Sequence, residues 1–269
     1  MSDADLFRQL HQGPEVLVLP NAWDAGTARL FADAGARAIA TTSSGIAWSL
    51  GCRDGDRVPL DLYLQVLRNI RRVVDLPVSA DIEGGYADDP ALVRDKVARF
   101  LDAGVVGINL EDGTADPDLA CAKIEAARQA ATAAGIALFI NARTDIWLRG
   151  LAAGREVEEA LDRARRYRSA GCDGLFVPGR TDAAGIAAVA GGTELPVNVM
   201  ARPGLPPLAT LAELGVRRLS AGGAIVQAAW GHARHLAAAM LRGDSEHLFD
   251  GALAYPATNA LFPVQGAES

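Results

Sequence analysis

The chain has 269 residues, of which 50% are hydrophobic and 22% are charged, and its formal net charge is −7. This apolar content is typical of an ordered globular protein, and the acidic balance argues against binding to nucleic acid or to an anionic membrane. No run approaches the roughly 20 apolar residues that a membrane span needs, and the N-terminal segment lacks a secretory signal pattern. We therefore expect a cytoplasmic protein without nucleic-acid or membrane partners.

Short runs rich in Val, Ile and Leu alternate with longer amphipathic stretches, which predicts buried parallel strands and covering helices. The predicted strands span 16–20, 38–42, 78–83, 107–112, 138–143, 174–178, 197–200 and 217–221. The predicted helices span 24–35, 59–74, 90–103, 118–134, 155–170, 182–190, 206–214 and 224–242. Eight strand–helix units indicate an α/β fold of the (β/α)8 TIM barrel type. An open doubly wound sheet is disfavoured, because LPNAWDAG stands where its glycine-rich phosphate loop belongs.

The chain contains no low-complexity linker, so we expect one barrel domain over residues 1–269 with a helical tail from about residue 243. The three cysteines are scattered and form neither a disulfide framework nor a metal-binding pair. Both lysines, Lys96 and Lys123, lie in helix-like stretches, which disfavours Schiff-base chemistry. Acid–base or electrostatic work should therefore fall mainly to carboxylates, arginines, hydroxyls and a metal ion.

Carboxylates collect at two neighbouring strand ends, where a barrel of this type places its active site. Asp81 and Glu83 are two residues apart in one predicted strand, so their side chains should share the face at the barrel mouth. Glu111 and Asp112 end the next strand. Such carboxylates repel each other unless a cation lies among them, and oxygen-only ligation favours Mg²⁺, with Mn²⁺ as the second option. Each carboxylate taken singly could instead cap a helix or pair with a base.

Arg143 ends the fifth predicted strand and offers a planar fork of donors suited to a carboxylate ligand. The same arginine could pair with Glu111, and the two roles are compatible. Asn198, at the end of the seventh predicted strand, is a further polar contact for a ligand.

Two loops near the predicted barrel mouth carry further polar groups. Ser43, Ser44 and Gly45 follow the second predicted strand as a loop that offers N–H groups and hydroxyls to an anion. Asp54 lies on a glycine-bearing loop that could fold over the mouth. We therefore expect both loops to contribute to a carboxylate-binding site.

The segments PNAWDAGTARLFADAG, TTSSGIAWSLGCRDGD, LPVSADIEGGY, GINLED and INARTD occur in this order. With them the chain resembles the phosphoenolpyruvate mutase/isocitrate lyase superfamily over about residues 14–262. The resemblance implies a (β/α)8 barrel whose eighth helix is swapped with a neighbouring subunit, in a homodimer or homotetramer. It also implies Mg²⁺-dependent cleavage or formation of a C–C or P–C bond beside a small 2-oxo or 2-hydroxy carboxylate, through an enolate.

The resemblance assigns roles to individual residues of this chain. Metal ligation falls to three carboxylates that stand at the family's strand-end positions: Asp81, Glu83 and Glu111. Substrate binding falls to Arg143 and to the segment Ser43, Ser44 and Gly45. Asp54 stands at the aspartate of the family's SLG-x-x-D loop, close to metal and substrate, so Asp54 and Arg143 are the catalytic candidates.

Two departures from the family pattern bear on the reaction. Lyases of the family carry a KKCGH segment whose cysteine is an acid–base residue on a gate, whereas here GTADPDLACAKIEAAR leads directly into a helix. We therefore predict that Cys121 is a packing residue. The strand-three pair also reads D-x-E in place of D-x-D.

The missing gate favours some reactions over others. Without it an enolate is readily protonated, which favours decarboxylation, hydrolysis or retro-aldol cleavage over phosphoryl transfer. The alternatives are a P–C bond phosphonomutase and a non-catalytic carboxylate-binding barrel.

Overall fold

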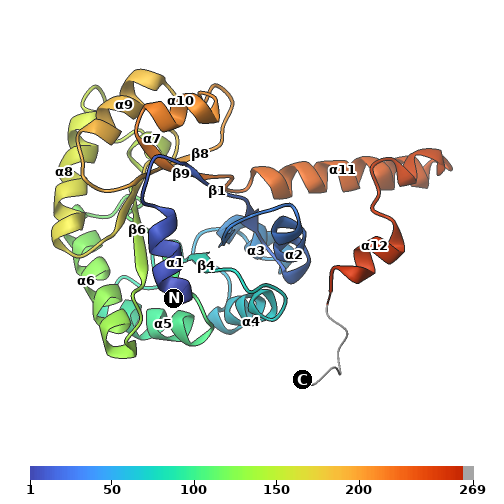
Figure 1. The fold of residues 1–269 in the computed structure, drawn as a ribbon, viewed down its shortest axis with the longest axis horizontal. Coiled ribbons are helices and arrows are strands. Elements are labelled where there is room, and N and C mark those ends of the chain that lie inside the picture. The colour runs from blue at the N-terminus through green and yellow to red at the C-terminus, as the bar shows by residue number, and fades with distance from the viewer. Residues whose placement is uncertain (263–269) are drawn as a thin grey trace.

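The computed structural model describes residues 1–262, and its parallel strands form a barrel surrounded by helices (Figure 1). The strands are β1 (Leu17–Leu19), β2 (Asn21–Ala22), β3 (Ile39–Thr41), β4 (Val78–Asp81), β5 (Gly107–Glu111), β6 (Phe139–Arg143), β7 (Gly174–Phe176), β8 (Val197–Met200) and β9 (Val216–Ser220). They pair in the order β1-β9-β8-β7-β6-β5-β4-β3-β2. Only Pro20 separates β1 from β2, so the two ends of this order join and the barrel closes.

The predicted TIM-type barrel is therefore confirmed. The one difference in strand number lies in the first predicted strand, 16–20, where the structure has β1 followed by β2. Proline has no N–H to donate to a neighbouring strand, so Pro20 interrupts the pairing at this point.

Helices on the outer face cover the barrel strands. They are α2 (Ala25–Asp33), α4 (Leu60–Arg71), α5 (Pro90–Asp102), α6 (Pro117–Ala134), α8 (Glu156–Ser169), α9 (Ala183–Gly191) and α10 (Leu208–Glu213). Three further helices were not predicted: α1 (Asp3–Leu10), α3 (Ser43–Ser49) and α7 (Ile146–Arg149). The expectation of a loop at residues 43–45 was thus wrong. Thr42 caps α3 there by accepting the N–H of Gly45, a favourable N-terminal arrangement.

Helix α1 closes the N-terminal end of the barrel. Its Phe7 and Leu10 are buried in one apolar cluster with Leu17 and Phe139. The ring of His11 stacks on that of Phe139 with 3.9 Å between centroids. Because this end is filled, the opening lies at the C-terminal ends of the strands.

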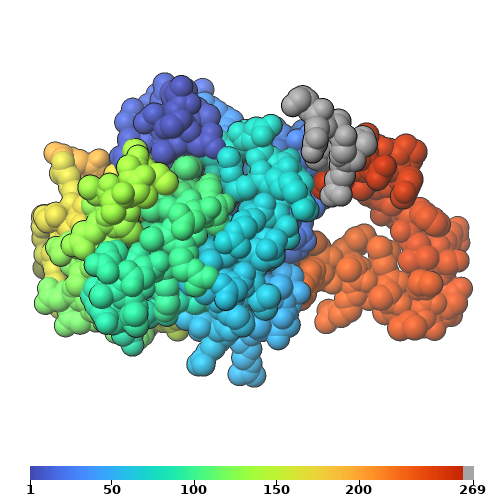
Figure 2. Space-filling view, turned by 90° about the horizontal axis from the view of Figure 1, so that it is seen from below, coloured from blue at the N-terminus to red at the C-terminus, as the bar shows by residue number. Residues whose placement is uncertain are grey.

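Helix α11 (Ala224–Leu241) extends away from the barrel that it follows (Figures 1 and 2). Of its side chains only Val226 and Ala239 are buried. Beyond it lie the short helices η1 (Glu246–Phe249) and α12 (Tyr255–Ala260), as expected of a helical tail. The last seven residues of the predicted domain lie outside the described residues. In residues 1–262 no helix is both long and apolar enough to cross a membrane.

Candidate active site

A cavity of about 160 Å³ lies at the C-terminal ends of the barrel strands. Five of the predicted site residues line it: Ser43, Ser44, Asp54, Asp81 and Arg143. The other lining residues are Asn21, Thr42, Asn109, Phe176, Met200, Ser220, Gly222 and Gly223. Larger hollows exist elsewhere on the surface, but none of those described gathers the predicted residues. The structure therefore brings most of the predicted set together at the end where barrel enzymes hold their sites.

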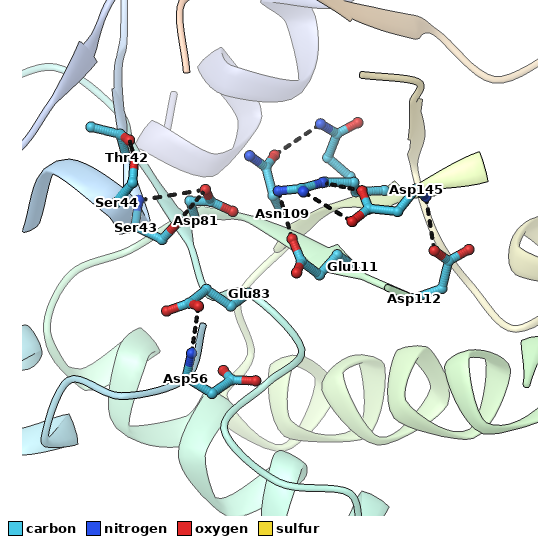
Figure 3. A network of polar contacts seen from close by, with 12 residues as sticks. Thr42, Ser43, Ser44, Asp56, Asp81, Glu83, Asn109, Glu111, Asp112 and Asp145 are labelled. Atoms are coloured by element: carbon cyan, nitrogen blue, oxygen red, sulfur yellow. Dashed lines mark hydrogen bonds and ion pairs between the residues drawn. The ribbon is translucent and has the colours of Figure 1, made fainter. Parts of the chain in front are cut away.

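Asp81 ends β4, and two neighbouring hydroxyl groups fix its backbone. The buried Tyr63 hydroxyl donates to the Asp81 carbonyl at 2.8 Å, and the Asp81 N–H donates to Thr41 Oγ1 at 3.0 Å. Its carboxylate accepts the Ser43 hydroxyl at Oδ2, at 3.1 Å (Figure 3). Its other oxygen, Oδ1, is buried and has no hydrogen-bond partner among residues 1–262. Asp81 thus has an oxygen available to a ligand.

Glu83 does not share a strand face with Asp81, contrary to the sequence prediction. Strand β4 ends at Asp81, and Glu83 has a φ of +52°. Its carboxylate accepts the N–H of Asp56 at 2.5 Å and the hydroxyl of Tyr86 at 3.2 Å (Figure 3). Burial raises the pKa of Glu83 to about 7, with added repulsion from neighbouring aspartates. Glu83 therefore ties the loop that carries Asp54 and Asp56 to the barrel rim.

Arg143 is held by two carboxylates. Its Nε and Nη2 donate to the two oxygens of Asp145 at 2.7 and 3.1 Å. Its Nη1 lies 2.5 Å from Glu111 Oε2. Burial raises the pKa of Glu111, and Arg143 opposes that rise. The guanidinium is therefore rigidly oriented, and its positive charge is offset by its two partners.

Asp112 does not face the barrel mouth, although the sequence placed it there. Its carboxylate accepts from Arg163 Nη1 and from the Tyr167 hydroxyl, each at 2.7 Å, and both donors belong to α8. Its other oxygen accepts the N–H of Asp145 at 2.9 Å (Figure 3). Asp112 therefore supports Asp145, which in turn orients Arg143.

The remaining predicted residues lie behind the cavity wall. Gly45 is buried in α3, where an added Cβ would lie 2.6 Å from Thr42 Cγ2. Asn198 is also buried, and its Oδ1 accepts the Ser220 hydroxyl at 3.2 Å. Asn109 and Ser220 line the cavity but were missed by the sequence reasoning. Each is a polar residue at an inward position of a largely apolar strand, and this pattern could have marked both as candidate site residues.

The predicted absence of a gate matches the chain path after β5. That strand ends at Glu111, and α6 begins at Pro117. Cys121 lies in α6 and lines a surface hollow with Glu125 and Arg166, away from the cavity. No segment of the KKCGH kind stands between the strand and the helix.

The carboxylates of the cavity are compatible with a hard cation. Asp54 and Asp81 both line it, and burial together with the charge of Asp81 raises the pKa of Asp54. Within residues 1–262, however, no three His, Cys, Asp or Glu side chains are placed as a ready metal cluster. Asp81 and Asp54 are therefore the carboxylates that line the cavity. Glu83 instead accepts the N–H of Asp56, and Glu111 pairs with Arg143. A Mg²⁺ ion commonly takes few carboxylates and keeps several waters, so this donor set fits it.

Residues 7–241 match the family described as phosphoenolpyruvate phosphomutase. The chain belongs to this family. An uncharacterized protein of Mycobacterium tuberculosis is 39% identical over 88% of this chain and 90% of its own. Oxaloacetate decarboxylase of Pseudomonas savastanoi pv. phaseolicola is 28% identical over 78% of this chain and 75% of its own. A solved protein of Burkholderia cenocepacia J2315, provisionally assigned as a phosphonomutase, is 45% identical with a TM-score of 0.83, covering 87% and 98% of the two chains.

Two solved structures of lower sequence identity share the fold of the present chain. The 2,3-dimethylmalate lyase, a PEP mutase/isocitrate lyase superfamily member, is 25% identical with a TM-score of 0.84, covering 97% and 94% of the two chains. Phosphonopyruvate hydrolase in complex with oxalate and Mg²⁺ is 23% identical with a TM-score of 0.85, covering 97% and 95%. The superfamily is one of enzymes that cleave C–C and P–C bonds, so the resemblance to this superfamily and the prediction of an enzyme are both confirmed.

Proposed function

We propose that the chain is a Mg²⁺-dependent lyase of the decarboxylase type, acting on a small 2-oxo or 2-hydroxy carboxylate through an enolate. The observation that carries this proposal is the small cavity in which Asp54, Asp81 and Arg143 meet at the barrel mouth. The similarity to oxaloacetate decarboxylase supports it.

The size of the cavity supports a substrate of three or four carbons. Its volume is about 160 Å³, well below the several hundred Å³ of sites for drug-sized ligands. Phe176 and Met200 form part of its wall, and the Arg143 guanidinium lies 5.9 Å from the centre of the Phe176 ring. This compact site suits a 2-oxo dicarboxylate of the oxaloacetate class, which is the substrate we propose.

The reaction requires little of the protein beyond charge and orientation. The bond between C3 and its carboxylate breaks, CO₂ leaves, and the electron pair stays on C3 as an enolate, which then takes up a proton. Mg²⁺, when bound near Asp81 and Asp54, supplies positive charge for the developing enolate oxygens. Arg143, fixed by Asp145 and Glu111, orients the remaining carboxylate. Because the segment between β5 and α6 is short, we assign the final proton to solvent.

A second candidate is P–C bond chemistry, favoured by the 45% identity to the Burkholderia protein. We would incubate the protein and Mg²⁺ separately with oxaloacetate, 2-methylmalate and phosphonopyruvate, and follow products by ¹³C and ³¹P NMR. Our proposal predicts pyruvate and CO₂ from oxaloacetate, above the rate with Mg²⁺ alone and lost in Asp81→Asn. Phosphoenolpyruvate formed from phosphonopyruvate would instead establish a mutase. Tight binding of oxalate without any turnover would establish a non-catalytic barrel.

We also propose that the chain forms a homodimer or homotetramer in which α11 of one copy covers another. An apolar groove of about 390 Å³ runs along the outer face of β1 and β9 and is lined by Val18, Phe31, Leu219 and Ile225 among others. Val18 is 44% exposed there. Helix α11 would cover this face if it folded back, but it extends outward (Figure 1). Its Trp230 is 44% exposed. An apolar helix from a second copy fits the groove.

A further inference from the structure

The barrel interior holds an arginine to which the proposed reaction assigns no role. Arg218 lies in β9 (VRRLS), where alternation places it on the buried face with Val216 and Ser220. It is 1% exposed and is the largest fully buried side chain among the described residues. Complete burial lowers the pKa of Arg218 to about 9, against the opposing charge of Asp81. Arg218 is therefore still a cation at neutral pH.

The charge of Arg218 has no direct counterion in the described part of the chain. Within residues 1–262 its hydrogen bonds go to Ser220 Oγ and Asn109 Oδ1, and its buried Nη1 has no partner there. An uncompensated buried cation is costly to a folded protein. Arg143 differs, because Glu111 and Asp145 offset its charge. An anionic ligand in the cavity would therefore stabilise Arg218 more than Arg143.

Arg218 reaches the cavity through Asn109. Asn109 Oδ1 accepts Arg218 Nη2 at 3.3 Å and also Asn141 Nδ2 at 2.9 Å. With its oxygen held by two donors, the Asn109 amide presents its nitrogen on the other side, and Figure 3 shows that nitrogen turned toward the side of Asp81. Asn109 lines the cavity and lies one layer deeper in the barrel than Glu111. Its N–H group is therefore a donor near the cavity floor.

We propose that Arg218 is a positioning residue that holds the Asn109 amide with its N–H directed into the cavity, where it donates to the innermost carboxylate oxygen of the substrate. The inference rests on the proposed function and adds a determinant of specificity. The Asn109 N–H donor favours substrates that place an ionised carboxylate at the cavity floor over substrates that place a neutral or apolar group there. A donor backed by a buried cation is a stronger partner for an anion than an isolated amide.

The test is a double-mutant cycle of Arg218→Met and Asn109→Ala, read as the dissociation constant of oxalate in the presence of Mg²⁺. Each single variant should weaken oxalate binding by about tenfold, the loss of one hydrogen bond to a charged group. If Arg218 acts through Asn109, the double variant loses little more than either single variant. A full product of the two effects, or unchanged affinity in either folded single variant, would overturn the inference.

A second pair of variants keeps the test decisive if Arg218→Met does not fold. Asn109→Asp supplies a counterion to Arg218 and replaces the N–H donor with an acceptor, so it should raise the melting temperature while weakening oxalate binding more than tenfold. Asn198→Asp is the matched control, because it adds the same charge beside Ser220 and leaves Asn109 intact. Equal losses in both variants would contradict the donor role of Asn109. Absence of oxalate binding by the wild type would contradict the proposed function itself.

Discussion

At the scale of single residues, the candidate site is defined by how its charges are partnered. Arg143 is fixed by Asp145 and Glu111, and Asp81 keeps one oxygen without a partner in residues 1–262. The sequence predicted Arg143 and its pairing with Glu111, because both end neighbouring strands. It did not predict that Glu83 turns toward Asp56. Glu83 has a φ of +52°, which takes it out of the strand conformation, and the alternation of residues in the sequence does not reveal this change.

The first prediction concerns the fork of Arg143. Arg143→Lys keeps the charge but cannot reproduce the paired hydrogen bonds to Asp145, so kcat/KM should fall roughly 100-fold, about 3 kcal/mol of transition-state stabilisation. Steady-state kinetics on the substrate found in the NMR panel would measure it. Arg149→Lys is the matched control, since Arg149 lies 3.6 Å from the same aspartate with its side chain 54% exposed. Equal losses in both variants would show that Asp145, not the fork, matters.

Arg218 was missed for a comparable reason. The strand VRRLS contains two adjacent arginines, and arginine is rarely buried in proteins. Strand alternation requires one of them to point inward, but it does not say which register the barrel adopts. Only the structure shows that Arg218 is the inward one.

At the scale of elements, strands with apolar runs could be predicted and short helices could not. The strands of the barrel follow from buried Val, Ile and Leu, whose pattern depends on burial from both faces. Helices α3 and α7 span seven and four residues, too few to show a period of 3.6. Since α3 carries Ser43 and Ser44 to the cavity, its position matters to the site.

The second prediction concerns the packing of α3 against its neighbours. Gly45→Ala places a Cβ 2.6 Å from Thr42 Cγ2 and 2.9 Å from Trp23 Cβ, so the helix must shift. We expect a loss of about 1–3 kcal/mol in unfolding free energy and weaker oxalate binding, measured by urea denaturation and calorimetry. Gly191→Ala, at a helical glycine with nothing within 4 Å, should not destabilise the protein. Unchanged stability of Gly45→Ala would argue against the tight packing of α3.

The third prediction concerns the helix that closes the barrel base. Burial lowers the pKa of His11 to about 3, below the unfolded value of about 6.5. The unfolded state therefore binds a proton that the folded state does not, and stability present above pH 6.5 is lost as pH falls toward 3. His11→Phe keeps the stack on Phe139 and removes this term, so its unfolding free energy should fall less steeply below pH 6.5. Parallel pH profiles of the two proteins would contradict the burial of a neutral His11.

At the scale of the whole molecule, the barrel and its last helix are separate features. The barrel end that holds the cavity was predicted from topology alone, because parallel strands bring all their C-terminal ends to one side. The path of α11 was expected only from the family resemblance, since its apolar face suits the barrel wall equally well. The structure shows that helix extended away from the barrel (Figure 2), and the apolar groove lies along β1 and β9.

The fourth prediction concerns assembly. Light scattering at micromolar concentration should give a dimer or tetramer, and Val18→Glu should dissociate it, because it places a charge in the groove. Leu62→Glu is the matched control, with a leucine 47% exposed on α4 away from the groove. A monomeric wild type, or dissociation by both variants alike, would contradict coverage of the groove by α11.

The central claim is that the cavity around Asp81 and Arg143 binds an enolate-like anion together with Mg²⁺. Calorimetric titration of oxalate, a stable mimic of the pyruvate enolate, tests it most directly when run with and without Mg²⁺ on the wild type and on Asp81→Asn. We predict binding by the wild type only with Mg²⁺, and its loss in the variant. Equal binding without the metal, or none under either condition, would contradict the claim and leave these carboxylates a structural role.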